Sequence, residues 1–347
     1  MNRTTVLIIL LFPGAKAQFQ PSVTLNPNSR NYVVKYQGES GKIHEVYFEP
    51  STKLMPFVTT NIFKSANSES LQFTYTIRND ASSLQRLQSF DIDLFSVVTN
   101  FREPNSHWRR GSYSFVRVFG WFNSNGEAGM PSPYDGVAPD SSETGFSFVS
   151  TGLPAIVNGY FAGSTSIVLA FPEEPPVEVS KLLKPLRSFP NNSIIRRTIA
   201  PKDPPMPSNL TVFLDTLLSY TRQSAELGWL GRDRDNDCDN DERPEDGIVR
   251  NIEQRLKKAQ RQLERRDSVL ARRELEKLVS KVERLWKRSE DNEERKHGKD
   301  RKNWWRRDKG ESVVMTSEAY ALLKYNTEYL IDRLPDRKPK KGSKDKD

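Results

Sequence analysis

The chain contains very little cysteine and histidine, and this scarcity excludes several kinds of protein. A single cysteine, Cys238, rules out an intrachain disulfide, so a secreted form must be held together by its hydrophobic core. The three histidines, His44, His107 and His297, share no spacing typical of a metal site. Phosphate-binding loops and the G-x-S-x-G and H-E-x-x-H motifs are missing from the sequence as well. We therefore expect a protein that is not an enzyme.

Long hydrophobic runs are also missing, apart from one short run near the N-terminus. One positive charge precedes the apolar stretch 6–12, a Pro-Gly pair interrupts it, and Ala15 and Ala17 occupy the two positions that a signal peptidase reads. A stretch of about seven residues is too short to cross a bilayer. The sequence predicts a signal peptide over 1–17, cleavage before Gln18, and a secreted protein, extracellular or periplasmic, with no transmembrane segment in the mature chain. The scarcity of cysteine favours a bacterial protein over a eukaryotic one.

The charge of the chain is dense but has no dominant sign. The formal net charge is +8, and residues 201–347 hold 35 of the 53 basic and 30 of the 45 acidic side chains. A surface that gathers nucleic acid needs an excess of positive charge in one place. We therefore do not expect nucleic acid as a partner, and we interpret the charges as the solvated faces of helices. The expected partner is an extracellular protein or a glycan.

Alternation of apolar and polar residues between 32 and 171 predicts many short strands. Leu71, Phe73, Tyr75 and Ile77, for example, alternate with polar residues before a turn signal. Several similar runs follow, each bounded by Gly, Pro, Asn or Ser. Such a series predicts an N-terminal antiparallel β-sandwich over 18–171.

The second half of the chain changes from prolines to helical patterns. Nine prolines fall between Pro172 and Pro207, which predicts an extended proline-rich linker over 172–208. Apolar residues three and four apart then predict about four helices within 209–335, and one apolar stripe on each helix predicts an antiparallel helical bundle. The basic tail 336–347 is expected to be disordered. The predicted fold class is therefore multidomain β + α: an N-terminal sandwich, a linker and a C-terminal bundle.

Three segments of the helical region carry a family resemblance. They are 213–230 (FLDTLLSYTRQSAELGWL), 247–267 (GIVRNIEQRLKKAQRQLERRD) and 317–334 (SEAYALLKYNTEYLIDRL), and they resemble the FIMAH domain. That family is a small helical module near the C-termini of secreted bacterial proteins, often accessory to other domains. The resemblance implies architecture and an exported bacterial context, because the family has no established catalytic residues. In the N-terminal region, QFTYTIRND and VAPDSSETGFSFVSTGLP resemble β-rich segments of uncharacterised exported bacterial proteins.

An acidic loop between the first two predicted helices carries the one pattern typical of a metal site. Positions one, three, five, seven and twelve of a calcium loop are taken by Asp235, Asp237, Asp239, Asp241 and Asp246. Asn240 stands where such loops have glycine, and the twelfth residue is aspartate where they have glutamate. Our hypothesis is a calcium ion held by these five side chains, with no other cofactor. The alternative is an acidic loop that stays solvated.

A second loop, before the last predicted helix, places tryptophans beside basic residues. Its members are Arg301, Lys302, Trp304, Trp305, Arg306 and Arg307. Guanidinium and indole groups side by side hold polyanions by charge and stacking. Acidic residues in the same loop dilute the positive field, so the alternative is that the tryptophans fold back onto the helices.

These patterns favour a secreted, non-catalytic bacterial protein acting in extracellular or cell-envelope interactions. The sandwich would be its binding head, because recognition is usually placed on loops of a rigid sheet, and the helices would be an accessory or docking module. Two alternatives stay open. A polyanion- or glycan-binding adhesin would use the tryptophan-basic loop. A carbohydrate-active enzyme would use two carboxylates of the sandwich, drawn from Asp91, Asp93, Glu103 and Asp135.

Overall fold

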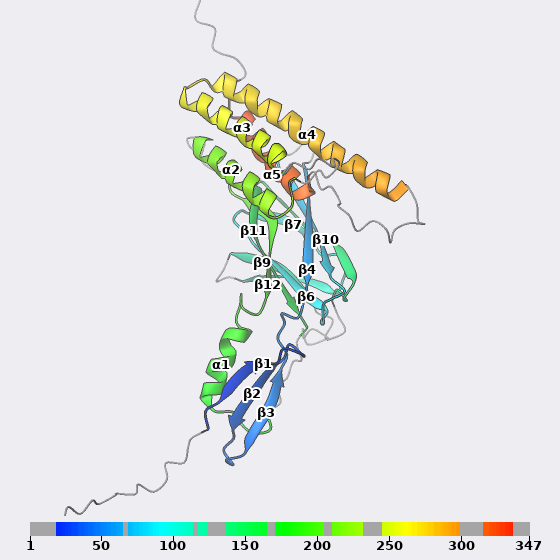
Figure 1. Cartoon of the computed structure of the whole chain (residues 1–347), viewed down its shortest axis with the longest axis vertical. Helices are drawn as coiled ribbons and strands as arrows, with labels where there is room; N and C mark the ends of the chain where they lie inside the picture. Colours follow the sequence, from blue (N-terminus) through cyan, green and yellow to red (C-terminus); the bar gives the residue numbers. More distant parts are fainter. Residues whose placement is uncertain are drawn as a thin grey trace, which may run out of the picture.

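The protein is built in three parts along its long axis (Figure 1). The computed structural model describes residues 19–64, 69–113, 117–123, 136–164, 171–204, 210–231, 245–298 and 315–335. Within these ranges the chain forms twelve strands and five helices. A small sheet with one helix occupies one end, two packed sheets the middle, and four helices the other end.

Two antiparallel sheets pack face to face in the middle part. The four-stranded sheet has the order β4-β5-β10-β7, formed by β4 (Pro56–Lys64), β5 (Leu71–Asn79), β10 (Ser141–Ser150) and β7 (Val98–Arg102). The five-stranded sheet has the order β12-β11-β6-β9-β8, formed by β12 (Ile194–Lys202), β11 (Leu153–Gly163), β6 (Leu87–Asp93), β9 (Val118–Asn123) and β8 (Trp108–Tyr113). Every neighbouring pair in both sheets runs antiparallel.

Aromatic side chains fill the space between these two sheets. Phe73 and Tyr75 alternate along β5 with polar residues of the opposite face, and both are fully buried. Tyr75 meets Phe90 of β6 edge to face at 5.4 Å between ring centroids, and Trp121 of β9 stacks on Phe90 at 5.6 Å. The Tyr75 hydroxyl donates to the carbonyl of Ile199 on β12 at 2.9 Å, so a hydrogen bond also joins the two sheets.

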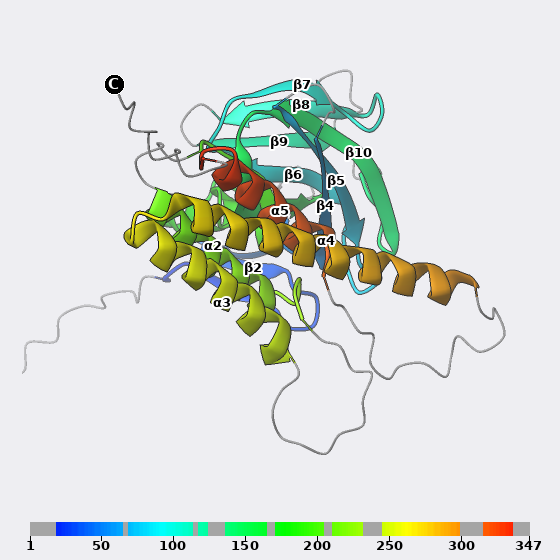
Figure 2. The same ribbon diagram turned by 90° about the horizontal axis from the view of Figure 1, so that it is seen from above.

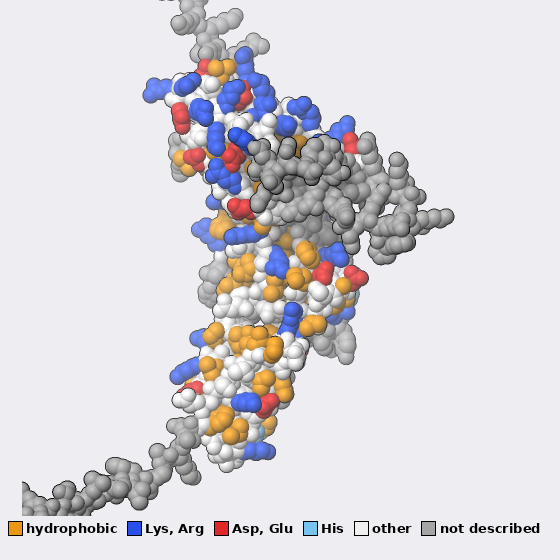
Figure 3. Space-filling view, viewed as in Figure 1, with side chains coloured by type: hydrophobic (Ala, Val, Ile, Leu, Met, Phe, Trp, Pro, Cys, Tyr) orange, Lys and Arg blue, Asp and Glu red, His pale blue; other side chains and the backbone are white. Residues whose placement is uncertain are grey.

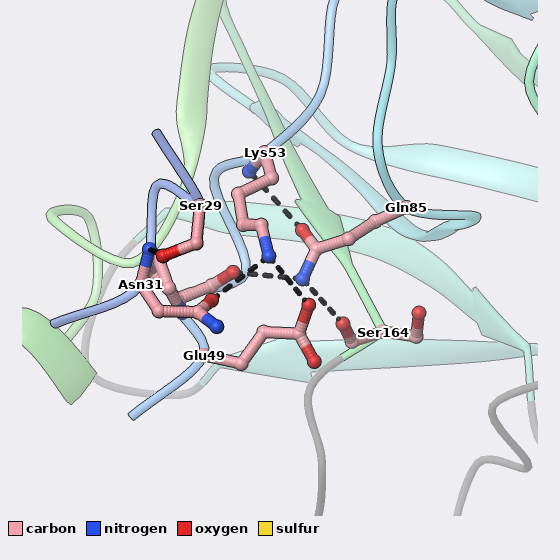
Figure 4. Close-up of polar contacts among 7 residues, drawn as sticks. Ser29, Asn31, Glu49, Lys53, Gln85 and Ser164 are labelled. Atoms are coloured by element: carbon pink, nitrogen blue, oxygen red, sulfur yellow. Dashed lines mark hydrogen bonds and ion pairs between the residues drawn. The ribbon is translucent and has the colours of Figure 1, made fainter. Parts of the chain in front are cut away.

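The third sheet forms a separate small unit. Its order is β1-β2-β3, with β1 (Ser22–Leu25), β2 (Tyr32–Gln37) and β3 (Ile43–Phe48), and helix α1 (Val177–Arg187) packs beside it. The unit has its own core, which comprises Val34, Tyr36, Val46, Phe48, Val179 and Leu183. A polar joint connects it to the sandwich (Figure 4): the Gln85 side chain donates to the carbonyls of Pro50 at 2.8 Å and Ser164 at 2.7 Å.

Four helices follow the last strand. They are α2 (Leu210–Glu226), α3 (Glu245–Glu264), α4 (Ser268–Gly298) and α5 (Ser317–Ile331). Helix α2 ends just before Gly228, whose φ of +73° is the left-handed conformation that glycine adopts at little cost. Helix α4 begins after Asp267, whose carboxylate accepts the Leu270 N–H at 3.1 Å as an N-cap. Figure 3 shows that basic and acidic side chains gather over the helical end, whereas the sheets carry fewer charges.

Helix α5 covers the free edge of β4. The Thr60 N–H donates to Glu318 Oε1 at 2.6 Å, and the Tyr325 hydroxyl donates to the carbonyl of Ile62 at 3.1 Å. The Asn326 amide donates to the carbonyl of Pro154 on β11 at 2.9 Å. Figure 2 shows α5 lying between α4 and the sheets. The helix therefore satisfies main-chain groups that an open sheet edge would leave unpaired.

The predicted division into one sandwich, a proline-rich linker and a separate C-terminal bundle is wrong. The described chain forms three sheets, and the four helices share one continuous apolar core with the sandwich. The expected linker 172–208 contains helix α1 and edge strand β12. Pro176 is tolerated because it precedes α1, and Pro201 because it lies on an edge strand, where a missing N–H costs little; Pro185 lies inside α1. The described chain does combine strands and helices, although helix α1 comes before the last strand, β12.

Candidate ligand-binding cleft

A cleft of about 530 Å³ lies where the second half of α5 meets the sandwich. Small-molecule sites commonly have volumes of about 300–1,000 Å³, so this cleft is large enough for a ligand. Its described lining comprises Lys64, Glu69, Leu71, Thr151, Leu153, Pro204, Tyr325, Glu328, Tyr329, Asp332 and Arg333. These residues come from the ends of β4, β5 and β11, the turn before β11, the segment after β12, and α5 with its C-terminal turn. The fold thus brings together segments that lie far apart in the sequence.

The floor of the cleft is apolar. Leu71 is buried at the start of β5, and Leu153 is half-buried at the start of β11. The half-buried rings of Tyr325 and Tyr329 stand beside them, one helical turn apart on α5. Because the Tyr325 hydroxyl is bonded to the carbonyl of Ile62, the position of its ring is fixed by the sheet.

An arginine covers one of these tyrosines. The Arg333 guanidinium carbon lies 3.4 Å from the centroid of the Tyr329 ring, and its Nη1 donates to the Tyr329 carbonyl at 3.2 Å. Phe213 of α2 contacts the same ring edge to face at 5.8 Å. A guanidinium carries five N–H donors, so one main-chain bond leaves donors for a ligand. Arg333 is therefore a positioned cation at the mouth of the cleft.

The rim of the cleft carries charges of both signs. Lys64 and Arg333 are basic, while Glu69, Glu328 and Asp332 are acidic. Burial raises the pKa of Glu328, although the charges of Lys324 and Lys64 oppose this. A ligand that offers both hydrogen-bond donors and acceptors suits such a rim, whereas an anion would meet three carboxyl groups.

A second polar group lies on the outward face of the five-stranded sheet. Asp91 and Asp93 are two residues apart on β6, so both point to the face opposite the core. Asp93 accepts hydrogen bonds from the Tyr160 hydroxyl at 3.0 Å and the Asn158 N–H at 3.2 Å. Asp91 is only 6% exposed; this burial raises its pKa to about 7, although a hydrogen bond with Ser89 opposes the rise. One carboxyl group of the pair thus holds its proton close to neutral pH.

The two sites proposed from the sequence fall almost wholly outside the described residues. Of the calcium ligands, Asp235, Asp237, Asp239 and Asp241 lie outside them, and Asp246 lies in the first turn of α3. The tryptophan-basic loop, 301–307, also lies outside. Within the described ranges no group of three or more His, Cys, Asp or Glu side chains is arranged to hold a metal ion. Calcium binding and polyanion binding at these loops stay predictions.

Of the four carboxylates considered for glycan hydrolysis, the fold brings two together. Asp91 and Asp93 share a face of β6, while Glu103 follows β7 of the other sheet and Asp135 lies outside the described residues. The cleft beside α5 was missed. Its one signal in the sequence is the pair Tyr325 and Tyr329, which lies outside the buried apolar stripe of α5 formed by Ala319, Leu322, Leu323 and Leu330.

Comparison with known proteins adds no relative: no protein-family model, no curated protein and no solved structure matches the chain. The resemblance of the helices to the FIMAH domain therefore stays a prediction. None of the helices in the described ranges combines the length and the apolar character that a membrane span requires. The geometry of the cleft and of the outward carboxyl pair is the basis on which function can be inferred.

Proposed function

We propose that the protein is a secreted, non-catalytic binding protein, extracellular or periplasmic, that holds a neutral glycan in the cleft beside helix α5. The observation that carries this proposal is the combination of an apolar floor with a rim of mixed charge. A sugar ring presents apolar C–H faces, which pack on the Tyr325 ring and the side chain of Leu153, while Arg333 covers the Tyr329 ring. The hydroxyl groups of the sugar both donate and accept hydrogen bonds, which suits Glu328 on one side and Lys64 and Arg333 on the other.

Two other ligand classes fit the cleft less well. A polyanion would be repelled by Glu69, Glu328 and Asp332 at the rim. An extended peptide would bind by adding a strand to a free sheet edge. The nearest edge, β4, is already covered, because Glu318 and Tyr325 bond its main-chain groups. A neutral glycan needs neither a charged field nor a free edge.

The test is a glycan array with the mature protein, followed by calorimetric titration of the strongest neutral ligand. Glu328→Gln and Arg333→Ala should each weaken binding at least about tenfold, or about 1.4 kcal/mol, because each leaves a buried ligand hydroxyl with a poorer partner. The control is Arg284→Ala, an exposed arginine on α4 that does not line the cleft. Wild-type affinity in both cleft variants, or binding of no neutral glycan, would contradict the proposal.

Glycan hydrolysis at the outward carboxyl pair is a second candidate function. Retaining and inverting glycosidases use one protonated and one ionised carboxyl group, and Asp91 holds a proton at near-neutral pH beside Asp93. Hydrolysis of a glycan panel that is lost in both Asp91→Asn and Asp93→Asn would favour this function. Binding without turnover in the wild type would favour the first.

A further inference from the structure

The polar joint between the small sheet and the sandwich places an amine, an amide and a carboxylate in contact. Lys53 Nζ lies 2.9 Å from Asn31 Oδ1 and 2.8 Å from Glu49 Oε1 (Figure 4). Asn31 and Glu49 stand at the same end of the β2–β3 ladder, because Tyr32 pairs with Phe48, Asn31 directly precedes Tyr32 and Glu49 directly follows Phe48. The lysine side chain is only 9% exposed, so little water reaches the amine.

We propose that Lys53 and Asn31 become joined by an intramolecular isopeptide bond, with Glu49 carrying a proton between them. The Lys53 ammonium gives a proton to Glu49, and the neutral amine attacks Asn31 Cγ while the carbonyl π electrons move to Oδ1. Glu49 then returns the proton to Nδ2. The C–Nδ2 bond breaks as the carbonyl re-forms, and ammonia leaves. The second proton of the attacking nitrogen goes to that ammonia, so the products are a secondary amide and one ammonium ion.

The main chain around the lysine is held on the sandwich by a glutamine. Gln85 Oε1 accepts the Lys53 N–H at 3.1 Å, and the Gln85 amide donates to Pro50 and Ser164. The Lys53 carbonyl accepts the Leu84 N–H at 2.9 Å. These bonds fix the segment that carries both the nucleophile and the proton carrier, so Gln85 acts as a positioning residue.

The asparagine is fixed from the other side. The main-chain carbonyl of Asn31 accepts the Asn26 N–H at 2.8 Å, and the main-chain N–H of Asn31 donates to the Ser29 hydroxyl at 3.2 Å. The main chain of both residues is held before any bond forms, and Nζ already lies 2.9 Å from Oδ1, the oxygen that is bonded to Cγ. Such preorganisation replaces an encounter between two free groups by an intramolecular step.

The bond would do what a disulfide cannot do in this chain. A single cysteine allows no intrachain disulfide, and joining Lys53 to Asn31 needs no oxidant. The bond would close the chain around β2 and β3 and keep the small sheet at the sandwich. It would also remove one positive charge from the joint, because the Lys53 ammonium becomes part of a neutral amide.

The test is peptide mapping of the wild-type protein after denaturation and trypsin digestion. Trypsin does not cut after an acylated lysine, so fragments 31–35 and 43–64 should appear as one linked species, lighter by one ammonia than their sum. If the wild type yields only separate fragments 43–53 and 54–64, the proposal is overturned. This readout does not depend on how the N-terminus is processed.

Two variants test the roles of Lys53 and Glu49 in forming the bond. Lys53→Arg removes the nucleophile but keeps a cation beside Glu49, and Glu49→Gln removes the proton carrier at nearly constant size. Both should abolish the linked species. The matched control is Lys35→Arg, in an exposed pair with Glu45 at 3.0 Å on the same sheet, and it should leave the link intact. A linked species at the wild-type level in Glu49→Gln would overturn the role of that carboxylate.

Discussion

Replacing Asp91 by asparagine should make the protein more stable at pH 8 and leave its stability at pH 4 nearly unchanged. Asp91 is buried on β6, and its pKa rises from 3.8 to about 7 on folding, because burial disfavours the charged form. Between these values the native state holds a proton that the unfolded state has released. The free energy of unfolding therefore falls as the pH rises from about 4 to about 7.

The magnitude follows from the two pKa values. Their difference corresponds to about 4 kcal/mol of lost stability once the pH is well above 7. Asparagine has nearly the same shape and stays neutral at every pH. Asp91→Asn should therefore remove this part of the pH dependence and unfold at a higher urea concentration than the wild type at pH 8.

The assay is urea unfolding followed by tryptophan fluorescence at pH values from 4 to 8. Trp121 is fully buried and stacks on Phe90, so unfolding of this sheet changes its signal. The control is Asp140→Asn, an exposed carboxylate whose side chain is 73% accessible, which should follow the wild-type pH profile. If the free energy of unfolding changed with pH in the same way for Asp91→Asn and for the wild type, the reasoning would be refuted.

Three further predictions test other parts of the structure. Gly120→Ala should destabilise the protein by about 1–3 kcal/mol in urea unfolding, because its new Cβ would collide with the Asp91 carboxyl and lie 2.6 Å from the carbonyl oxygen of Phe90. Glu318→Ala should be less stable than Glu318→Gln by about 1–3 kcal/mol, because only glutamine keeps an acceptor for the buried N–H of the β4 edge; equal stabilities would contradict this. If the acidic loop binds calcium, millimolar calcium should raise the melting temperature and Asp235→Asn should abolish the rise, whereas identical melting curves with calcium and chelator would exclude the site.

Local patterns predicted the positions of individual elements because each pattern depends on residues close in the chain. The alternation from Leu71 to Ile77 lies on β5 with its apolar members in the core. The stripe of the last predicted helix is likewise buried on α5, which begins at Ser317. Periodicity shows that a face will be covered but does not show by what, so a stripe could not reveal whether a helix packs on other helices or on a sheet.

The packing of the strands and helices on one another could not be predicted from the sequence, as particular residues show. Strand β12 was taken for linker because prolines surround it, although Thr198, Ile199 and Ala200 are buried in the sheet. The polar residues Glu318 and Asn326 of α5 are the signal that the helix meets a strand edge, because each bonds main-chain groups of the sheets. Apart from the pair Tyr325 and Tyr329, the sequence carries no signal of the cleft, because its walls come from residues more than 250 positions apart.

Hydrogen–deuterium exchange with a bound neutral glycan tests the central claim most directly. If the ligand occupies the cleft, amides of 325–333, 69–71 and 151–153 should exchange more slowly in the complex, because these segments line the site. Exchange over the exposed face of α3 and α4 should stay the same. Protection confined to those two helices, or to the outward face of the five-stranded sheet around Asp91, would contradict the assignment of the cleft as the binding site.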